Sequence, residues 1–170
     1  MAMVEGMLQE LEQEAQTTRR VLERVPEAHL TWRRHPKSMS LGQLALHIAS
    51  VPGAVAEMAA LPGLDSAPSF EHPPAPTAAE LVPTLAESVA RARAAIGGMS
   101  DQQAMETWTL KDGDRVILAM PRAAVLRSIM LNHWYHHRGQ LSVYLRELNV
   151  PVPSIYGPSA DENPFGTPGE

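Results

Sequence analysis

Apolar residues recur every three or four positions in the first part of the chain, which is the spacing of one face of an α-helix. Over residues 3–25 this pattern predicts a single helix, and Pro26 ends it because proline cannot continue the helical hydrogen bonds. Residues 29–40 mix charged and apolar positions and contain a proline, so they are predicted to form a connecting loop. The positions on the helix face are Met7, Leu8, Leu11, Ala15, Thr18, Leu22 and Val25.

A second helix is predicted to begin at Ser40. The run Ser40-Leu41-Gly42-Gln43 has the Ser-x-x-Gln form of a capping box, in which two side chains satisfy backbone N–H groups at the start of a helix. Pro52 lies inside this helix and is expected to kink or divide it. The predicted buried stripe contains Leu41, Leu44, Ile48, Val51 and Val55.

Proline and glycine mark the limits of a third helix. Residues 61–76 contain five prolines and are predicted to be a loop. Thr77-Ala78-Ala79-Glu80 has the form of a second capping box and opens the helix. Gly97-Gly98 suits its C-terminal end, where glycine is the favoured residue.

Residues 107–120 are predicted to form a short β-hairpin, because two β-prone runs flank Asp112-Gly113, a dipeptide favoured in type I′ turns. A fourth helix is predicted from Pro121 to about Leu148, with Asn149 as its C-terminal cap. The pattern therefore predicts an all-α fold of one domain, residues 1–170, with a hairpin before the last helix. Its irregular tail, residues 150–170, is rich in proline and glycine and is expected to pack partly on the helices.

The amino-acid composition narrows the set of possible functions. The net charge is −5 and no basic run is present, which argues against a nucleic-acid partner because phosphate binding needs a positive surface. The chain has no cysteine, so thiolate metal sites and a cysteine nucleophile are excluded. No apolar run approaches the roughly 18 residues of a membrane span, and the N-terminal residues show no export signal. We therefore expect a cytoplasmic protein that does not enter the membrane.

The fourth helix contains "NHWYHHRGQ", residues 132–140. At about 100° per residue, His133 and His137 fall on the inward apolar face, whereas His136 lies at its margin. Residues at i and i+4 are about 6 Å apart along the helix, so both imidazoles can bind one ion. His47, at the edge of the buried stripe of the second helix, is the best candidate for a third ligand. Gln140 returns to the same face, where it can contact a ligand.

Other readings stay open. A single inward histidine is more often a hydrogen-bonded structural residue than a metal ligand. The remaining histidines, His29, His35 and His72, lie in loops and are explained as surface residues. No general base stands out. Three arginines are candidates for an anion contact: Arg122, Arg127 and Arg138.

Three stretches resemble the DinB-like family, in particular its YfiT-like group of metal-dependent proteins. They are "PKSMSLGQLALHIA" with His47, "TWTLKDGD", and the long run from "MPRAAVLRSIMLNHWYHHRGQ" to "PSIYGPSADE" with His133 and His137. The resemblance implies an up-down-down-up four-helix bundle, in which these three histidines hold a divalent metal, often nickel or zinc. It also implies a homodimer. Relatives include thiol-dependent S-transferases and isomerases, so a low-molecular-weight thiol is one implied small-molecule substrate.

The preferred hypothesis is a metal-dependent enzyme, either a thiol S-transferase or a hydrolase, because three protein ligands leave a coordination position open. One alternative is a non-catalytic, stress-related protein that binds a metal or a small molecule. Another is a structural dimer whose histidines bind no metal.

The helical phase predicts that His137→Ala releases a bound metal, because it removes an inward ligand, whereas His136→Ala retains it. Elemental analysis of protein purified without a nickel column measures the metal content of both variants. Equal metal content would show that the predicted phase is wrong.

Overall fold

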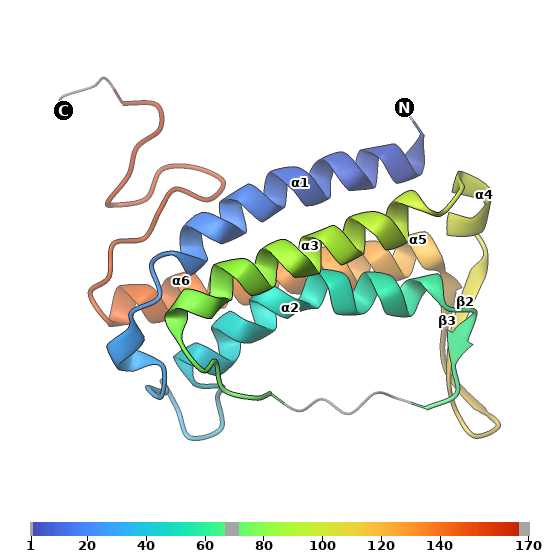
Figure 1. The fold of residues 1–170 in the computed structure, drawn as a ribbon, viewed down its shortest axis with the longest axis horizontal. Coiled ribbons are helices and arrows are strands. Elements are labelled where there is room, and N and C mark those ends of the chain that lie inside the picture. The colour runs from blue at the N-terminus through green and yellow to red at the C-terminus, as the bar shows by residue number, and fades with distance from the viewer. Residues whose placement is uncertain (1, 67–71, 167–170) are drawn as a thin grey trace.

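The computed structural model describes residues 2–66 and 72–166, and the structural statements below concern these residues. The chain is mostly helical, with a small three-stranded sheet at one end (Figure 1). Residues 67–71 of the predicted loop and residues 167–170 of the predicted tail lie outside the described residues.

Helices α2 and α3 lie side by side and run in the same direction, opposite to α1 and α6 (Figure 1). α6 continues directly from α5 through a π-helical segment, η3, so the predicted fourth helix is one continuous rod of three parts. The long helices are α1 (Met3–Leu22), α2 (Leu41–Ala60), α3 (Leu81–Gly97) and α6 (His133–Glu147), and the shorter segments are η1 (Glu27–His29), η2 (Ala78–Glu80), α4 (Asp101–Ala104), α5 (Arg122–Val125) and η3 (Leu126–Asn132).

The predicted hairpin is present as strands β2 (Thr107–Asp112) and β3 (Arg115–Pro121), which pair antiparallel. A third strand, β1 (Gly63–Leu64), pairs parallel to β2 within the predicted loop 61–76. Two residues are too few to show an alternating pattern, so the sequence does not reveal this strand. The turn residues are Gly113 and Asp114, and only the glycine has a positive φ. The predicted type I′ turn at Asp112-Gly113 is therefore wrong, because that turn needs two positive φ values.

The predicted helix ends are partly correct. The capping box at Ser40 is confirmed: its hydroxyl accepts a hydrogen bond from the Gln43 N–H at 3.2 Å, and the Gln43 side chain accepts one from the Ser40 N–H at 3.0 Å. The capping box at Thr77 is wrong, because Thr77 makes no side-chain cap bond. The Ala78 N–H instead donates to Glu27 Oε2 at 2.5 Å, so a residue from another segment satisfies it. The predicted first helix extends three residues too far.

Pro52 neither divides nor ends α2. Because proline has no N–H, the carbonyl of Ile48 loses its normal helical donor. The indole N–H of Trp134, on α6, donates to that carbonyl at 2.9 Å. The Gly53 N–H of α2 also donates to Ser88 Oγ of α3 at 2.8 Å, and a Cβ at Gly53 would lie only 2.7 Å from the Ser88 carbonyl oxygen. The part of α2 around Pro52 is thus joined to both α6 and α3.

A buried ion pair joins α1, α6 and the tail. Arg138 is 1% exposed and Glu14 is 6% exposed, and their charged groups lie 2.5 Å apart. The Tyr156 hydroxyl accepts from Arg138 at 2.5 Å and donates to Glu14 at 3.0 Å. Further ion pairs connect Glu162 and Asp161 of the tail to arginines of α1 and α6. The tail therefore contacts the helices through specific charged groups.

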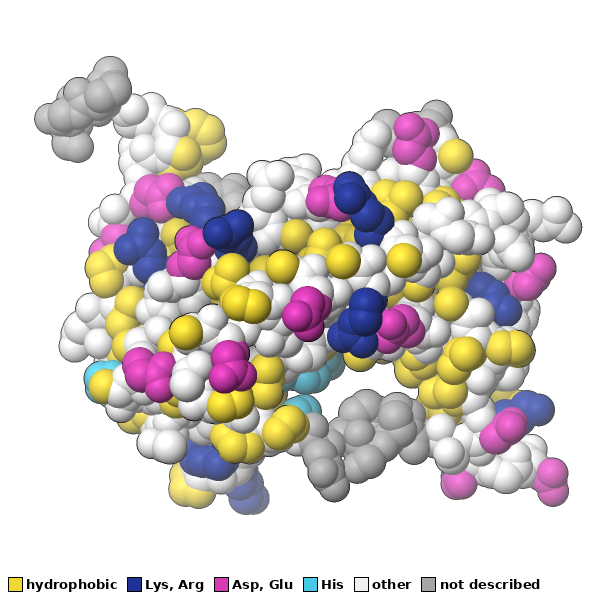
Figure 2. All heavy atoms as spheres, viewed as in Figure 1, with side chains coloured by type: hydrophobic (Ala, Val, Ile, Leu, Met, Phe, Trp, Pro, Cys, Tyr) yellow, Lys and Arg dark blue, Asp and Glu magenta, His cyan; other side chains and the backbone are white. Residues whose placement is uncertain are grey.

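Acidic and basic side chains are interspersed on the face shown in Figure 2, with apolar side chains between them. Arg93 of α3 pairs with Glu12 of α1 at 2.8 Å, and Arg91 pairs with Glu57 of α2 at 2.9 Å. No described helix is long and apolar enough to cross a membrane.

Trp134→Phe is expected to lower the free energy of unfolding by about 1–3 kcal/mol, because it leaves the buried Ile48 carbonyl without a donor. In a Pro52→Ala background the same substitution should cost less, since residue 52 then supplies the helical N–H. Denaturant unfolding of the two single variants and the double variant measures the difference. Equal costs in both backgrounds would contradict this role of Trp134.

Candidate metal centre

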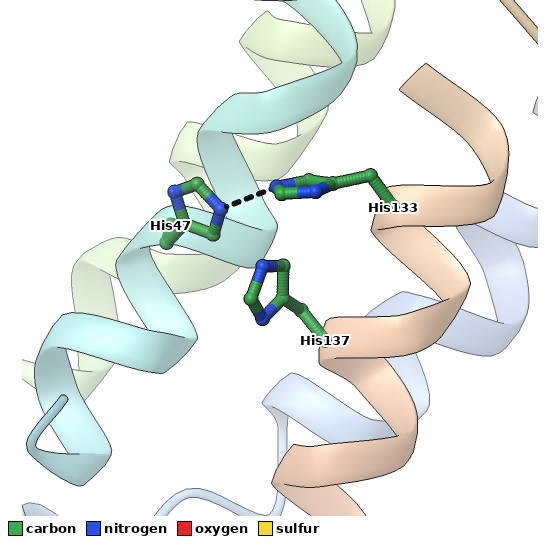
Figure 3. A group of neighbouring side chains, drawn as sticks. All are labelled: His47, His133 and His137. Atoms are coloured by element: carbon green, nitrogen blue, oxygen red, sulfur yellow. Dashed lines mark hydrogen bonds between the residues drawn. The ribbon is translucent and has the colours of Figure 1, made fainter. Parts of the chain in front are cut away.

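The three predicted ligands meet between two helices. Figure 3 shows His47 of α2 facing His133 and His137 of α6. One side-chain nitrogen from each residue lies within 4.8 Å of the other two. The Nε2 atoms of His47 and His133 are 3.0 Å apart, and the ring centroids of His133 and His137 are 4.3 Å apart. The structure thus brings together three imidazoles separated by up to 90 positions in the chain.

The donor set fits a divalent transition metal. Two nitrogens bound to one ion at about 2.0–2.1 Å, with a bond angle of about 90–110°, lie roughly 2.9–3.4 Å apart. The 3.0 Å separation of His47 Nε2 and His133 Nε2 falls in this range. Three imidazoles without a thiolate suit zinc, copper, iron or nickel. In the metal-free protein the same contact is a hydrogen bond in which one ring donates and the other accepts.

Gln140 orients one of the three rings. Its Oε1 lies 2.8 Å from Nδ1 of His137, one helical turn earlier. An amide oxygen only accepts, so Nδ1 carries the proton and Nε2 keeps its lone pair free for a ligand role. The contact expected for Gln140 is therefore present.

The position of the histidines on α6 differs from the prediction. The fully buried face of α6 is centred on Trp134 and Arg138, and His133 and His137 lie on its flank, partly exposed. The π-helical segment before His133 has more residues per turn than an α-helix. The buried face predicted from the apolar residues upstream of His133 is therefore rotated relative to the buried face of α6. His136 is exposed, as the phase within α6 predicts.

All three rings favour the neutral form. Burial, and then the nearby His137 and His133, lowers the pKa of His47 to about 4. Burial also lowers the pKa of His137 to about 4, although its hydrogen bond to Gln140 acts in the opposite direction. The pKa of His133 is lowered as well, mainly by burial. Neutral imidazole is the form that binds a metal, so the site is ready for one near neutral pH.

His72, predicted to be a surface residue, is partly buried against this site. Its ring packs edge-on against His47, with the centroids 5.1 Å apart. Gln43 holds this segment: its Nε2 donates to the His72 carbonyl at 2.5 Å while its Oε1 completes the capping box of α2. A glutamate would also complete the capping box but has no donor for His72.

The three arginines suggested as anion contacts are engaged elsewhere, so that prediction is wrong. Arg127 forms two hydrogen bonds of 2.6 Å to Glu10, and Arg138 is paired in the core. Arg122 donates to the backbone carbonyls of Ala59 and Leu61, where it joins α2 to the last helical rod. Each arginine stabilises helix packing, and none lines the cavity beside the histidines.

That cavity has a volume of about 480 Å³. It is lined by His137, Gln140 and His72, and by residues of the loop between α1 and α2. It therefore borders His137, one of the three histidines, and its volume is typical of small-molecule sites.

Comparison with known proteins places this chain in one family. The DinB family model matches residues 1–166, and the chain belongs to the DinB family. It is 29% identical over 163 residues to the uncharacterised protein YrdA of Bacillus subtilis, covering 94% of this chain and 91% of YrdA.

Two crystal structures have a similar fold. A DinB-like protein from Bacillus cereus superposes with a TM-score of 0.67 at 23% identity, covering 89% of this chain and 97% of that one. The DinB-like protein YjoA from Bacillus subtilis superposes with a TM-score of 0.64 at 18% identity, covering 86% and 96%. At these identities the likeness concerns the fold.

The lowered pKa values predict how the site responds to acid. Between about pH 6.5 and 4 the unfolded chain binds more protons than the folded one, so the stability of metal-free protein falls as the pH drops through this range. Added metal should stay bound at pH 5.5 and dissociate as the pH approaches 4, where protons compete for the ligands. Metal content after dialysis at graded pH, with denaturant unfolding of the metal-free protein, tests both. Release centred above pH 6 would contradict the lowered pKa values.

Proposed function

We propose that the protein is a metal-dependent enzyme of the thiol S-transferase or hydrolase type. Its metal, nickel or zinc, would be held by His47, His133 and His137. The convergence of three neutral imidazoles beside an open cavity is the observation that carries this proposal. Three protein ligands leave at least one position for a substrate, whereas structural zinc sites are usually closed by four.

A divalent ion bound there supplies Lewis acidity, which lowers the pKa of a coordinated thiol or water. The chain's own residues hold and orient the ligands. Gln140 accepts a hydrogen bond from the Nδ1–H of His137 and so directs the other ring nitrogen, Nε2, inward. The hydrogen bond from Trp134 to the Ile48 carbonyl links the two helices that carry the ligands. The His72 ring packs against the His47 ring and also lines the cavity.

Several finer expectations accompany this proposal. The helix directions support an up-down-down-up four-helix bundle formed by α1, α2, α3 and the rod that ends in α6. The homodimer, the cytoplasmic location and the absence of a nucleic-acid partner remain predictions from the sequence.

One observation favours the second candidate, a non-catalytic metal or small-molecule binding protein. No aspartate or glutamate lines the cavity within the described part of the chain, so no carboxylate is placed there as a general base. A protein that only binds its ligand has no need of one. A metal-activated thiol reaction also needs none, because the metal itself promotes loss of the thiol proton.

Metal analysis and thiol turnover test the proposal. Untagged protein should contain about one equivalent of metal and should accelerate the reaction of cysteine or 2-mercaptoethanol with monochlorobimane. His47→Ala should lose the metal and return the rate to the uncatalysed background, because it removes one of three ligands. His29→Ala, which alters a histidine in η1, should match the wild type. A protein that holds metal but is inert with every thiol and every ester tested would support the binding role instead.

A further inference from the structure

The cavity beside the three histidines carries a charge opposite to that of the whole chain. The chain has a net charge of −5, yet the charged residues that line the cavity are Arg34 and Lys37. Both belong to the loop between α1 and α2. The rest of the described lining is apolar, uncharged polar or histidine.

This loop is held in place by its own hydrogen bonds. Arg33 donates to the Ser38 carbonyl at 3.0 Å, and the Ser38 N–H donates to the His35 carbonyl at 2.9 Å. The Lys37 N–H lies 3.2 Å from His35 Nδ1, its acceptor. The loop is closed at its base by the Leu41 N–H, which donates to the Trp32 carbonyl at 2.9 Å. The backbone positions of Arg34 and Lys37 are thus determined by the fold of the loop.

Contacts with α6 fix this loop over the cavity. The Trp32 ring packs edge-on against Tyr144, with the centroids 5.3 Å apart, and the Tyr144 hydroxyl donates to the Met39 carbonyl at 3.3 Å. Arg34 pairs with Glu147 at 3.0 Å. α6 therefore carries both the histidine pair and the anchor points of the loop.

The two cations differ in how they are compensated. Glu147 balances the charge of Arg34, whereas Lys37 forms no ion pair with any residue of the ranges 2–66 and 72–166. Together, the two cations and Glu147 leave one net positive charge at the cavity. That charge matches a carboxylate better than a doubly charged phosphate. The ammonium of Lys37 is a compact charge on a flexible stem, which suits an anion that enters from solvent.

We propose that this cavity selects a small molecule bearing a carboxylate, which Lys37 binds with Arg34 beside it. Another atom of the same molecule reaches the three-histidine centre past His137, the member of the three that lines the cavity. This inference rests on the proposed metal-dependent function and adds the substrate class to it. The cavity volume of about 480 Å³ accommodates a molecule with both groups.

The test uses cobalt-substituted protein and two thiols of similar size, 3-mercaptopropionate and 3-mercapto-1-propanol. Absorption from thiolate bound to cobalt reports the affinity of each. The wild type should bind the carboxylate about five to ten times more tightly, and added sodium chloride should reduce this preference by screening. Lys37→Gln should abolish most of the preference.

Lys111→Gln is the matched control, because Lys111 is the other lysine of the chain and lies on β2 away from the cavity. It changes the net charge equally and should keep the preference. Equal affinity of the wild type for both thiols, or an unchanged preference in Lys37→Gln, would overturn the inference while leaving the metal-dependent function intact.

If the proposed metal-dependent function is wrong, the same experiment gives a different result: no cobalt is bound, or neither thiol produces the absorption. Metal-free protein then tests the cavity alone. In NMR titrations, 3-mercaptopropionate should shift the amide signals of residues 37–39 and 140–144 more than the alcohol does, and Lys37→Gln should remove the difference. Equal shifts from both compounds would overturn the carboxylate site.

Discussion

The carbonyl oxygen of Ile48 is the point on which the arrangement of the helices depends. Pro52 removes the helical donor to this oxygen, and the indole of Trp134 replaces it from α6. His47 directly precedes Ile48, and His133 directly precedes Trp134. This interhelical hydrogen bond therefore joins the two helices directly next to two imidazoles from distant parts of the chain. A helix with a complete ladder of hydrogen bonds would offer no buried carbonyl to hold the partner helix in this register.

Different faces of α6 contribute to the buried interior and to the histidine site. The fully buried face carries Trp134 and Arg138, and the charge of Arg138 is tolerated there because Glu14 and the Tyr156 hydroxyl satisfy it. The imidazoles of His133 and His137 take the flank, where burial keeps them neutral and His137 still borders a cavity. A site at the centre of the core would be closed to any substrate.

Prediction from sequence succeeded where the information is local. The spacing of His133 and His137 places both on one side of a helix, and the phase within α6 separates them from His136. It failed where a residue depends on a distant segment. Arg138 was a candidate for an anion contact, but its charge is paired with Glu14, which lies more than a hundred positions away. His72 and Lys37 lie in loops, which have no periodicity to show the direction of a side chain.

The sequence by itself determined the helical character, the capping box at Ser40, the hairpin and the three histidines that line one site. These follow from residue type and from spacing within a few turns, which act over short distances along the chain. Only the tertiary structure decided that a π-helical segment shifts the buried face of α6, that His72 packs on His47, and that the loop with Lys37 borders the cavity. The reason is physical: these features arise from packing and hydrogen bonds between segments far apart in sequence, whose geometry no local pattern encodes.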